Sequence, residues 1–276
     1  MCNVLDVSRS GYYEWLSRPA SQRNKENQRI LELMKNSHDA CQGMCGLTKM
    51  LEDIREEIPH CSRNRAYRIQ KDHQIYSVRK QKPFRVCTTD SEHLLPVADN
   101  LLQQKFNIDQ PDKVWVTDIT YLSTEEGTAY LAIVKDIHDK EIVGWSVEYH
   151  MRTELCLAAL ETAVKRRRPG AGLIHHSDRG SQYCSDAYRE NLKSHKMQCS
   201  MSRKGNCWDN ACAETFFSTL KSERIRGKKY KNIEELRRDL FWYIESFYNR
   251  NRRHAALGNL TIPAFKKLAA EFESAA

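Results

Sequence analysis

The chain has 276 residues, enough to bury one large domain with a smaller one attached. Its 44 lysines and arginines exceed its 36 aspartates and glutamates, and the formal net charge of +8 favours a polyanionic partner without excluding an ordinary basic enzyme. No apolar run is long enough to cross a bilayer and the N-terminus lacks the regions of a secretory signal, so we expect a cytoplasmic protein with no membrane partner.

The 10 cysteines are scattered, and no Cys-x-x-Cys motif occurs among them. In a reducing compartment such residues behave mostly as small buried apolar groups, so we expect no disulfides. His38, Cys41 and Cys45 have the i, i+3, i+7 spacing of one helical face, but Gly43 and Gly46 disfavour a helix there. Packing, rather than a zinc site, is therefore predicted at these three residues.

The first 85 residues are polar and basic, and apolar residues recur at helical spacing in 22–35 and 47–54. Ser62 is placed to cap a third helix, which carries Arg65 and Arg68 among its basic residues. Short helices with one basic member resemble a helix-turn-helix DNA-binding region, but a small bundle with a solvated basic helix fits the same pattern. Residues 1–85 are thus predicted to be helical, with both interpretations open.

A linker is predicted at 86–111, where prolines and polar residues interrupt the pattern. Three β-rich runs follow at 114–121, 130–134 and 142–147, and their short connections predict an antiparallel meander.

Helical patterns at 153–168, after Ser185, at 210–223 and at 233–247 then alternate with short strands at 173–174 and 198–201. This order is typical of a ribonuclease-H-like α/β fold, a mixed five-stranded sheet flanked by helices, and we assign 112–276 to it.

Three acidic residues are placed to share a site in such a fold. Asp118 lies on the first strand, Asp178 follows the fourth strand, and Glu214 lies on a later helix. On that helix Glu214 and Lys221 share a face that is distinct from the apolar stripe, so Glu214 can face a site while the stripe packs on the sheet. Clustered carboxylates can hold Mg²⁺ and leave coordination positions for water and phosphate. If this helix is considered alone, the alternative interpretation is that Glu214 and Lys221 are an ordinary Glu and Lys on a solvated helical face.

Three other polar residues near these acids receive their own interpretations. Asp136, on the second predicted strand, is expected to be structural rather than a metal ligand. His175 and His176 either approach phosphate or are satisfied structural histidines.

The three acids lie within the segments WVTDITY at 115–121, HSDRGSQY at 176–183 and NCWDNACAE at 206–214. These segments resemble those of the catalytic subunit of insertion-sequence transposases of the IS-three type, whose core is similar to that of retroviral integrases. Asp178 and Glu214 are separated by 35 residues, the spacing that gives this superfamily its usual name. YNRNRRHAAL at 248–257 resembles the family's C-terminal signature, and the resemblance weakens before about residue 95.

The resemblance implies a DNA transposase with an integrase-like catalytic core, acting at the nucleoid. Such an enzyme is a Mg²⁺-dependent polynucleotidyl transferase that cleaves at transposon ends and joins the 3′-hydroxyls to target DNA. The resemblance also implies that Asp118, Asp178 and Glu214 are the catalytic residues and metal ligands. We expect Mn²⁺ to substitute for Mg²⁺, and we expect no zinc. The implied partners are DNA of the transposon ends and the target, further copies of the chain, and an upstream-frame subunit with a helix-turn-helix.

We expect DNA contacts from seven basic side chains: Lys221, Arg179, Arg250, Arg252, Arg253, Arg65 and Arg68. Two other functions fit the same residues. A structure-specific nuclease on this fold would hydrolyse DNA without rejoining it, and a DNA-binding regulator would have a catalytically silent site. The intact acidic triad argues against the regulator.

Overall fold

The computed structural model describes residues 2, 4, 6–77, 96–203 and 210–275. The chain divides into two compact units, Met1–Ser77 and Val78–Ala276. Residues 86–95 of the predicted linker and residues 206–209 of the third acidic segment lie outside the described residues. Within the described ranges, no helix is both long and apolar enough to span a bilayer.

The N-terminal unit is helical, as predicted. Its helices are α1 (Arg9–Ser17), α2 (Gln22–Ala40), α3 (Leu47–Glu57) and α4 (Arg63–Asp72). The last three pack on one another around Ile30, Met50 and Ile54, which are fully buried. Ser62 caps α4 as predicted, since its hydroxyl accepts a hydrogen bond from the amide of Arg65 at 3.3 Å.

Cys41 and Cys45 lie in the core of this bundle and not on one helical face. α2 ends at Ala40, and Gly43 in the following turn has a φ of +77°, a left-handed conformation that suits glycine. The amide of Cys45 donates to Cys41 Sγ at 3.0 Å, and both side chains are buried. The helix interruption predicted from the glycines is therefore confirmed.

The C-terminal unit is built on a five-stranded sheet with the order β3-β2-β1-β4-β5. Its strands are β1 (Val114–Thr124), β2 (Gly127–Asp136), β3 (Ile142–Glu148), β4 (Ile174–Ser177) and β5 (Gln198–Met201). The first three form the predicted antiparallel meander, while β1, β4 and β5 are parallel to one another. The predicted ribonuclease-H-like arrangement is confirmed.

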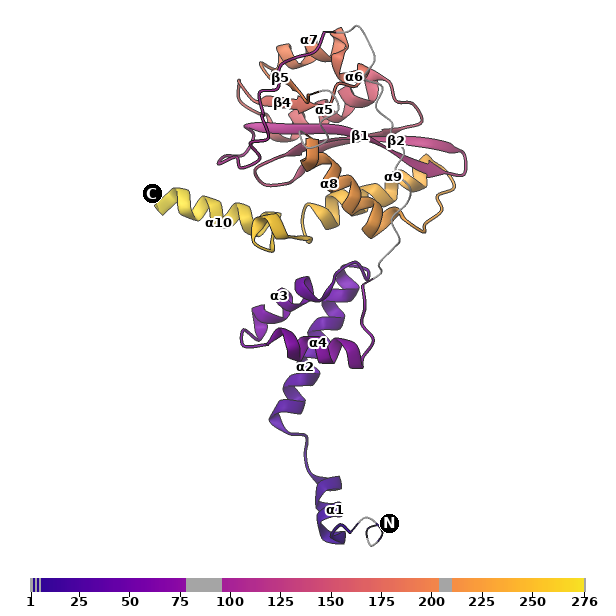
Figure 1. The fold of residues 1–276 in the computed structure, drawn as a ribbon, viewed down its shortest axis with the longest axis vertical. Coiled ribbons are helices and arrows are strands. Elements are labelled where there is room, and N and C mark those ends of the chain that lie inside the picture. Colours follow the sequence, from indigo (N-terminus) through magenta and orange to yellow (C-terminus); the bar gives the residue numbers. More distant parts are fainter. Residues whose placement is uncertain (1, 3, 5, 78–95, 204–209, 276) are drawn as a thin grey trace. The chain divides into compact units, whose positions relative to one another are not determined.

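Helices cover both faces of this sheet. On one face lie α5 (Thr153–Arg167), α6 (Ser181–Cys184) and α7 (Asp186–Ser194), and on the other lie α8 (Ala211–Leu220) and α9 (Ile233–Phe241) (Figure 1). The chain then passes through β6 (Arg253–His254), η4 (Ala255–Leu257) and β7 (Leu260–Thr261) into α10 (Ile262–Ala275).

Two π-helical segments, η2 (Lys221–Ile225) and η3 (Trp242–Tyr248), extend α8 and α9. The predicted helices at 210–223 and 233–247 are thus continuous, but each changes pitch partway. In a π-helical turn residues five apart come into line. The rings of Trp242 and Phe247 accordingly stack at 5.7 Å with an interplanar angle of 2°.

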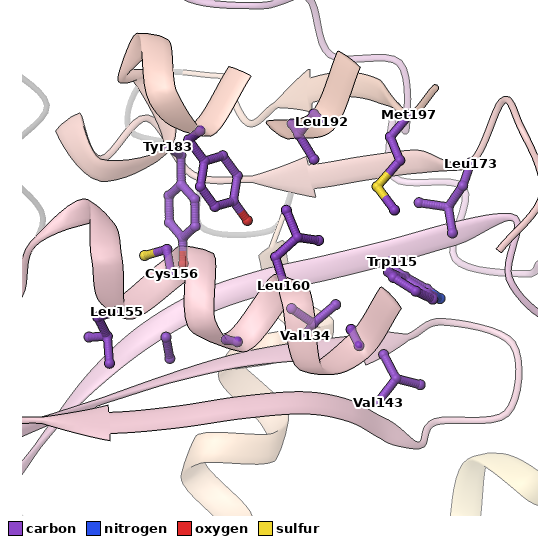
Figure 2. Close-up of a cluster of buried hydrophobic side chains, with 14 of the residues drawn as sticks. Trp115, Val134, Val143, Leu155, Cys156, Leu160, Leu173, Tyr183, Leu192 and Met197 are labelled. Atoms are coloured by element: carbon purple, nitrogen blue, oxygen red, sulfur yellow. The ribbon is translucent and has the colours of Figure 1, made fainter. Parts of the chain in front are cut away.

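The main core fills the space between the sheet and α5 to α7. Figure 2 shows Trp115 and Val134 from the sheet together with Leu160 from α5 and Leu192 from α7, all of them buried. Gly144 on β3 allows α5 to lie directly against the strand. A Cβ at this position would be 2.2 Å from the carbonyl oxygen of Ala159 and 2.8 Å from Cβ of Ala163.

Part of the predicted linker packs along β5. The amide of Leu101 donates to Ser200 Oγ at 2.9 Å, the amide of Met201 donates to the carbonyl oxygen of Asp99 at 3.3 Å, and Leu102 is buried. β5 ends the strand order, and an open sheet edge presents unpaired backbone groups. This stretch covers that edge, a tertiary role that its polar composition did not reveal.

A nearly buried ion pair ties η2 to the C-terminal segment. Arg252 Nη2 lies 2.8 Å from Glu223 Oε1, and the two side chains are 14% and 15% exposed. Tyr243 donates its hydroxyl hydrogen to Glu223 Oε2 at 2.8 Å. Because η2 continues the helix that carries Glu214, this pair also supports the far end of that helix.

Substituting Gly144 tests the close packing of α5 on β3. Gly144→Ala is expected to lower the free energy of unfolding by about 1–3 kcal/mol, because the added methyl group would overlap the α5 backbone. Gly170→Ala is the matched control, since a Cβ there meets nothing within 4 Å. Denaturant unfolding should separate the two variants, and equal stabilities would contradict the packing described.

Substituting Arg252 tests whether this side chain stabilises the fold or binds DNA. Arg252→Met is expected to cost about 3 kcal/mol or more in unfolding free energy, because Glu223 would keep a poorly solvated and unpaired charge. Arg250→Met, at an exposed position two residues earlier, should change stability little. A stable Arg252→Met variant with selectively weakened DNA binding would instead assign Arg252 to the DNA interface.

Candidate active site

Asp118 and Asp178 occupy matching positions on neighbouring parallel strands. Val116 of β1 pairs with His176 of β4, and each aspartate lies two residues further along its own strand direction. Parallel strands are about 5 Å apart and side chains two residues apart share a face, so the two carboxylates emerge side by side. β4 ends at Ser177, so Asp178 directly follows the carboxyl end of the strand.

The loop after β4 holds the Asp178 carboxylate. The amide of Gly180 donates to Asp178 Oδ1 at 2.9 Å. A Cβ at Gly180 would lie 3.1 Å from the same oxygen and 2.9 Å from Gln182 Oε1. A side chain at position 180 would thus press on the carboxylate.

The helix that carries Glu214 is attached to β1 beside Asp118. Asn210, immediately before α8, donates from Nδ2 to the carbonyl oxygen of Thr117 at 3.1 Å. Glu214 is one helical turn further on and is exposed, whereas Ala213, Phe216, Phe217 and Leu220 are buried. The predicted division of this helix into an apolar stripe and an acidic face is therefore confirmed.

The pKa of Asp118 reflects the charges of the two other acids. Loss of hydration raises the pKa of Asp118 well above its usual range, and the negative charges of Asp178 and Glu214 raise it further. The hydrogen bond from the amide of Ile119, at 2.8 Å, and the positive charge of Lys221 act in the opposite direction. Both other acids are thus close enough to disfavour ionisation of Asp118.

The donor chemistry of this cluster suits a hard divalent cation. All three side chains offer carboxylate oxygens, the ligands that Mg²⁺ and Mn²⁺ prefer, and a cation would offset their mutual repulsion. Among the described residues, no three His, Cys, Asp or Glu side chains lie close enough together to hold a metal ion as they stand. Like charges that repel one another are expected to stand apart until a cation draws them together.

Lys221 lies at the same site. Its Nζ is 4.3 Å from the centre of the Tyr121 ring, and its charge acts on Asp118. Burial and the neighbouring positive charge of Arg226 lower the pKa of Lys221, against the effect of Asp118. The two cations therefore lie near each other, and Arg226 has a buried Nε with no hydrogen-bond partner among the described residues.

Two residues that support the site were not singled out from the sequence. Tyr183, in the second acidic segment, is buried, and its hydroxyl oxygen lies 3.2 Å from Thr117 Oγ1. Thr117 in turn donates to the carbonyl oxygen of Ile133 at 2.7 Å. These contacts join α6 to β1 at the residue before Asp118, and they join that residue to β2. In the sequence, Thr117 is one residue of a predicted strand and Tyr183 one residue of the second acidic segment, and neither pattern indicates a supporting role.

The two histidines before Asp178 are buried and hydrogen-bonded. His176 lies between Ser200 Oγ, 2.8 Å from Nδ1, and Ser202 Oγ, 3.2 Å from Nε2. His175 Nε2 is 3.2 Å from the Tyr188 hydroxyl oxygen, and burial lowers the pKa of His175 to about 3. A neutral, enclosed imidazole does not attract phosphate, so the structural alternative holds for His175.

Asp136 has the structural role predicted for it. Its carboxylate accepts hydrogen bonds from the amides of Asp112 and His138, each at 2.7 Å. Burial and the charge of Asp139 raise the pKa of Asp136 to about 6. These bonds hold the approach to β1 against the turn after β2.

The predicted DNA-contacting arginines of this unit have different surroundings. Arg250 is exposed, whereas Arg252 is paired with Glu223. Arg253 is half-buried and donates to the carbonyl oxygen of Asn259 at 3.2 Å. Arg179, next to Asp178, is half-buried and donates from Nε to the carbonyl oxygen of Ser202 at 2.8 Å.

In the N-terminal unit the two predicted contacts also differ. Arg68 on α4 is exposed beside Tyr67, which is 52% exposed. Arg65 forms an ion pair with Glu26 of α2, and its Nε donates to Asn27 Oδ1 at 2.8 Å. Arg65 thus fastens α4 to α2, and Arg68 lies on the open face of α4.

Known proteins resemble both the core and the whole chain. A family model described as an integrase core domain matches residues 108–207, and a second model with the same description matches residues 195–261. In Shigella sonnei, the insertion element IS600 uncharacterized 31 kDa protein is 43% identical over 267 residues, covering 97% of each chain. Transposase InsF for insertion sequence IS3A of Escherichia coli (strain K12) is 37% identical over 270 residues, covering 96% of this chain and 92% of the relative.

Solved structures of retroviral integrases are more distant. The HTLV-2 integrase catalytic core domain in complex with magnesium is 13% identical, with a TM-score of 0.41 over 56% of this chain and 96% of that one. The catalytic core domain of BIV integrase is 14% identical, with a TM-score of 0.42 over 59% of this chain and 97% of that one. The identity across nearly the full length of the bacterial relatives shows that this chain belongs to the IS3 family of insertion-sequence transposases.

Proposed function

We propose that the chain is a divalent-metal-dependent DNA transposase with Asp118, Asp178 and Glu214 as its catalytic residues. The observation that carries the proposal is the placement of two aspartates side by side on parallel strands, with the Glu214 helix bonded to one of those strands. The family membership supplies the substrate class, the DNA of an insertion sequence.

The proposed reaction has two displacements at phosphorus. In the first, water attacks a phosphodiester at a transposon end, breaks the P–O3′ bond and leaves a free 3′-hydroxyl. In the second, that 3′-hydroxyl attacks a phosphodiester of the target, forms a new ester and releases the target's own 3′-hydroxyl. Bound Mg²⁺, or Mn²⁺ in its place, would supply activation of the attacking oxygen and stabilisation of the leaving oxygen.

The side chains have distinct proposed tasks. Asp118, Asp178 and Glu214 would hold the metal, and the amide of Gly180 keeps the Asp178 carboxylate in position. Lys221 would bind a DNA phosphate beside the acids, which is consistent with its charge acting on Asp118.

Further DNA contacts are proposed from three other arginines. Arg250 would contribute from its exposed position in the C-terminal unit and Arg68 from the exposed face of α4, while Arg179, half-buried and bonded to Ser202, would contribute because it directly follows Asp178. Arg65, Arg252 and Arg253 have protein partners, so we assign them mainly to holding those surfaces in shape. Two transposon ends must be handled together, which favours a multimer, and an upstream-frame subunit with a helix-turn-helix remains a proposed partner.

Removing one carboxylate tests the catalytic assignment. Asp118→Asn, Asp178→Asn and Glu214→Gln are each expected to slow cleavage and joining at least about 1000-fold, because about 4 kcal/mol of transition-state stabilisation is lost with a metal ligand. DNA binding should largely persist, since it depends on lysine and arginine. The assays are gel shift and strand joining on oligonucleotides with insertion-sequence ends.

The control for these variants is Asp186→Asn, an exposed acid in the first turn of α7, which should keep both activities. Full activity of Asp178→Asn in Mg²⁺ would contradict the assignment. Hydrolysis of pre-nicked ends without joining would indicate a nuclease, and no product at any Mg²⁺ or Mn²⁺ concentration would indicate a binding regulator.

The proposed phosphate contact of Lys221 allows a second test. Lys221→Gln is expected to weaken DNA binding and to reduce the slope of log K against log salt by about 0.9, the effect of one lost phosphate contact. Lys165→Gln, on α5 with a side chain that is 80% exposed, is the control and should leave the slope unchanged. Salt titrations of binding would measure both variants, and a parent-like slope for Lys221→Gln would exclude this contact.

A further inference from the structure

The first turn of α8 is fixed to the sheet at two points. Asn210 donates from Nδ2 to the carbonyl oxygen of Thr117, the residue before Asp118, at 3.1 Å. Lys135 of β2 donates from Nζ to the carbonyl oxygen of Cys212 at 3.0 Å. Asn210 is 5% exposed and Lys135 is 4% exposed, so both bonds lie away from solvent.

Burial of the Lys135 side chain at this position costs free energy. Burial lowers the pKa of Lys135 to about 8, which reports the cost of keeping its charge away from water. A carbonyl in the first turn of a helix already accepts a hydrogen bond from the amide four residues on, so Cys212 does not need Lys135 to satisfy its backbone. An apolar side chain at position 135 would fill the space at lower cost.

Both bonds act on the turn that carries Glu214. Glu214 is four residues after Asn210 and two after Cys212. The two bonds hold this turn from two directions, since one joins α8 to β1 and the other joins α8 to β2. The place of Glu214 relative to Asp118 on β1 therefore depends on both bonds.

We infer that Asn210 and Lys135 are positioning residues, which hold Glu214 at the distance from Asp118 that cation binding requires. This inference rests on the proposed function, in which both acids are metal ligands. Neither residue is assigned a contact with DNA or with metal. Their effect reaches the metal through the position of the helix.

Asn249 provides a matched control elsewhere in the same unit. It is 6% exposed, and its amide joins a helical segment to a strand by donating to the carbonyl oxygen of Ile142 and accepting from the amide of Ile142, each at 3.0 Å. Asn249→Ala therefore removes a buried helix-to-strand bond of the same kind from the β3 side of the sheet. It should destabilise the fold without moving Glu214.

The test measures Mn²⁺ binding by the full chain, from the electron paramagnetic resonance signal of free Mn²⁺. Asn210→Ala and Lys135→Met are each expected to weaken Mn²⁺ binding about 10- to 100-fold, the effect typical of residues that orient metal ligands. Asn249→Ala should bind Mn²⁺ like the parent chain. Hydrogen exchange without metal gives an independent readout, in which amides of 211–220 exchange faster in the first two variants only.

Lys135→Met keeps the test decisive if Asn210→Ala fails to fold. Replacing a buried charge with an apolar side chain of similar length is expected to leave global stability unchanged or raised. A variant that is as stable as the parent but binds Mn²⁺ more weakly cannot be explained by general loss of structure.

The outcomes separate this inference from the proposed function. Asp178→Asn serves as the reference for loss of the metal site itself. Parent-like Mn²⁺ affinity in Asp178→Asn overturns the proposed site and the inference with it. Weak binding in Asp178→Asn, together with parent-like affinity and α8 exchange in Asn210→Ala or Lys135→Met, overturns the positioning role alone.

Discussion

The approach of three acidic side chains to one another is the constraint around which the C-terminal unit is organised. Parallel pairing of β1 and β4 brings Asp118 beside Asp178, and attachment of α8 to β1 adds the charge of Glu214. In the half-buried surroundings of Asp118 these charges are poorly screened, and together they oppose its ionisation. Such a site is stabilised by positive charge, which Lys221 supplies in part and a divalent cation would supply more fully.

The rest of the unit holds the elements that carry these acids in place. Phe216, Phe217 and Leu220 bury the apolar stripe of α8, and the ion pair of Glu223 with Arg252 secures the π-helical segment that follows. On the other face, Tyr183 and the packed α5 keep β1 in place behind Asp118. The site is thus supported by packed elements on both faces of the sheet.

Arginine side chains in this chain have two kinds of surroundings that composition does not distinguish. Arg252, Arg253 and Arg65 have protein partners and hold segments together, whereas Arg250 and Arg68 are exposed. The net charge of +8 therefore overstates the positive charge that these positions would offer to a polyanionic partner.

Local patterns in the sequence predicted the elements and the places of the three acids. Alternation located β1 to β3, capping located α4 and α7, and helical periodicity separated Glu214 from the apolar stripe of its helix. The supporting contacts could not be predicted in this way, because they join residues far apart in the chain. Asn210 and Thr117 are 93 residues apart, and Lys135 and Cys212 are 77 apart. The packing of 98–102 on β5 likewise joins residues far apart in the chain.

The proposed metal site is tested most directly by anomalous diffraction from crystals of the chain grown with Mn²⁺. We expect an anomalous peak in contact with carboxylate oxygens of Asp118, Asp178 and Glu214, with the first turn of α8 still bonded to β1. An ordered site with no anomalous peak at saturating Mn²⁺, or a peak bound by other residues while these three carboxylates remain apart, would contradict it.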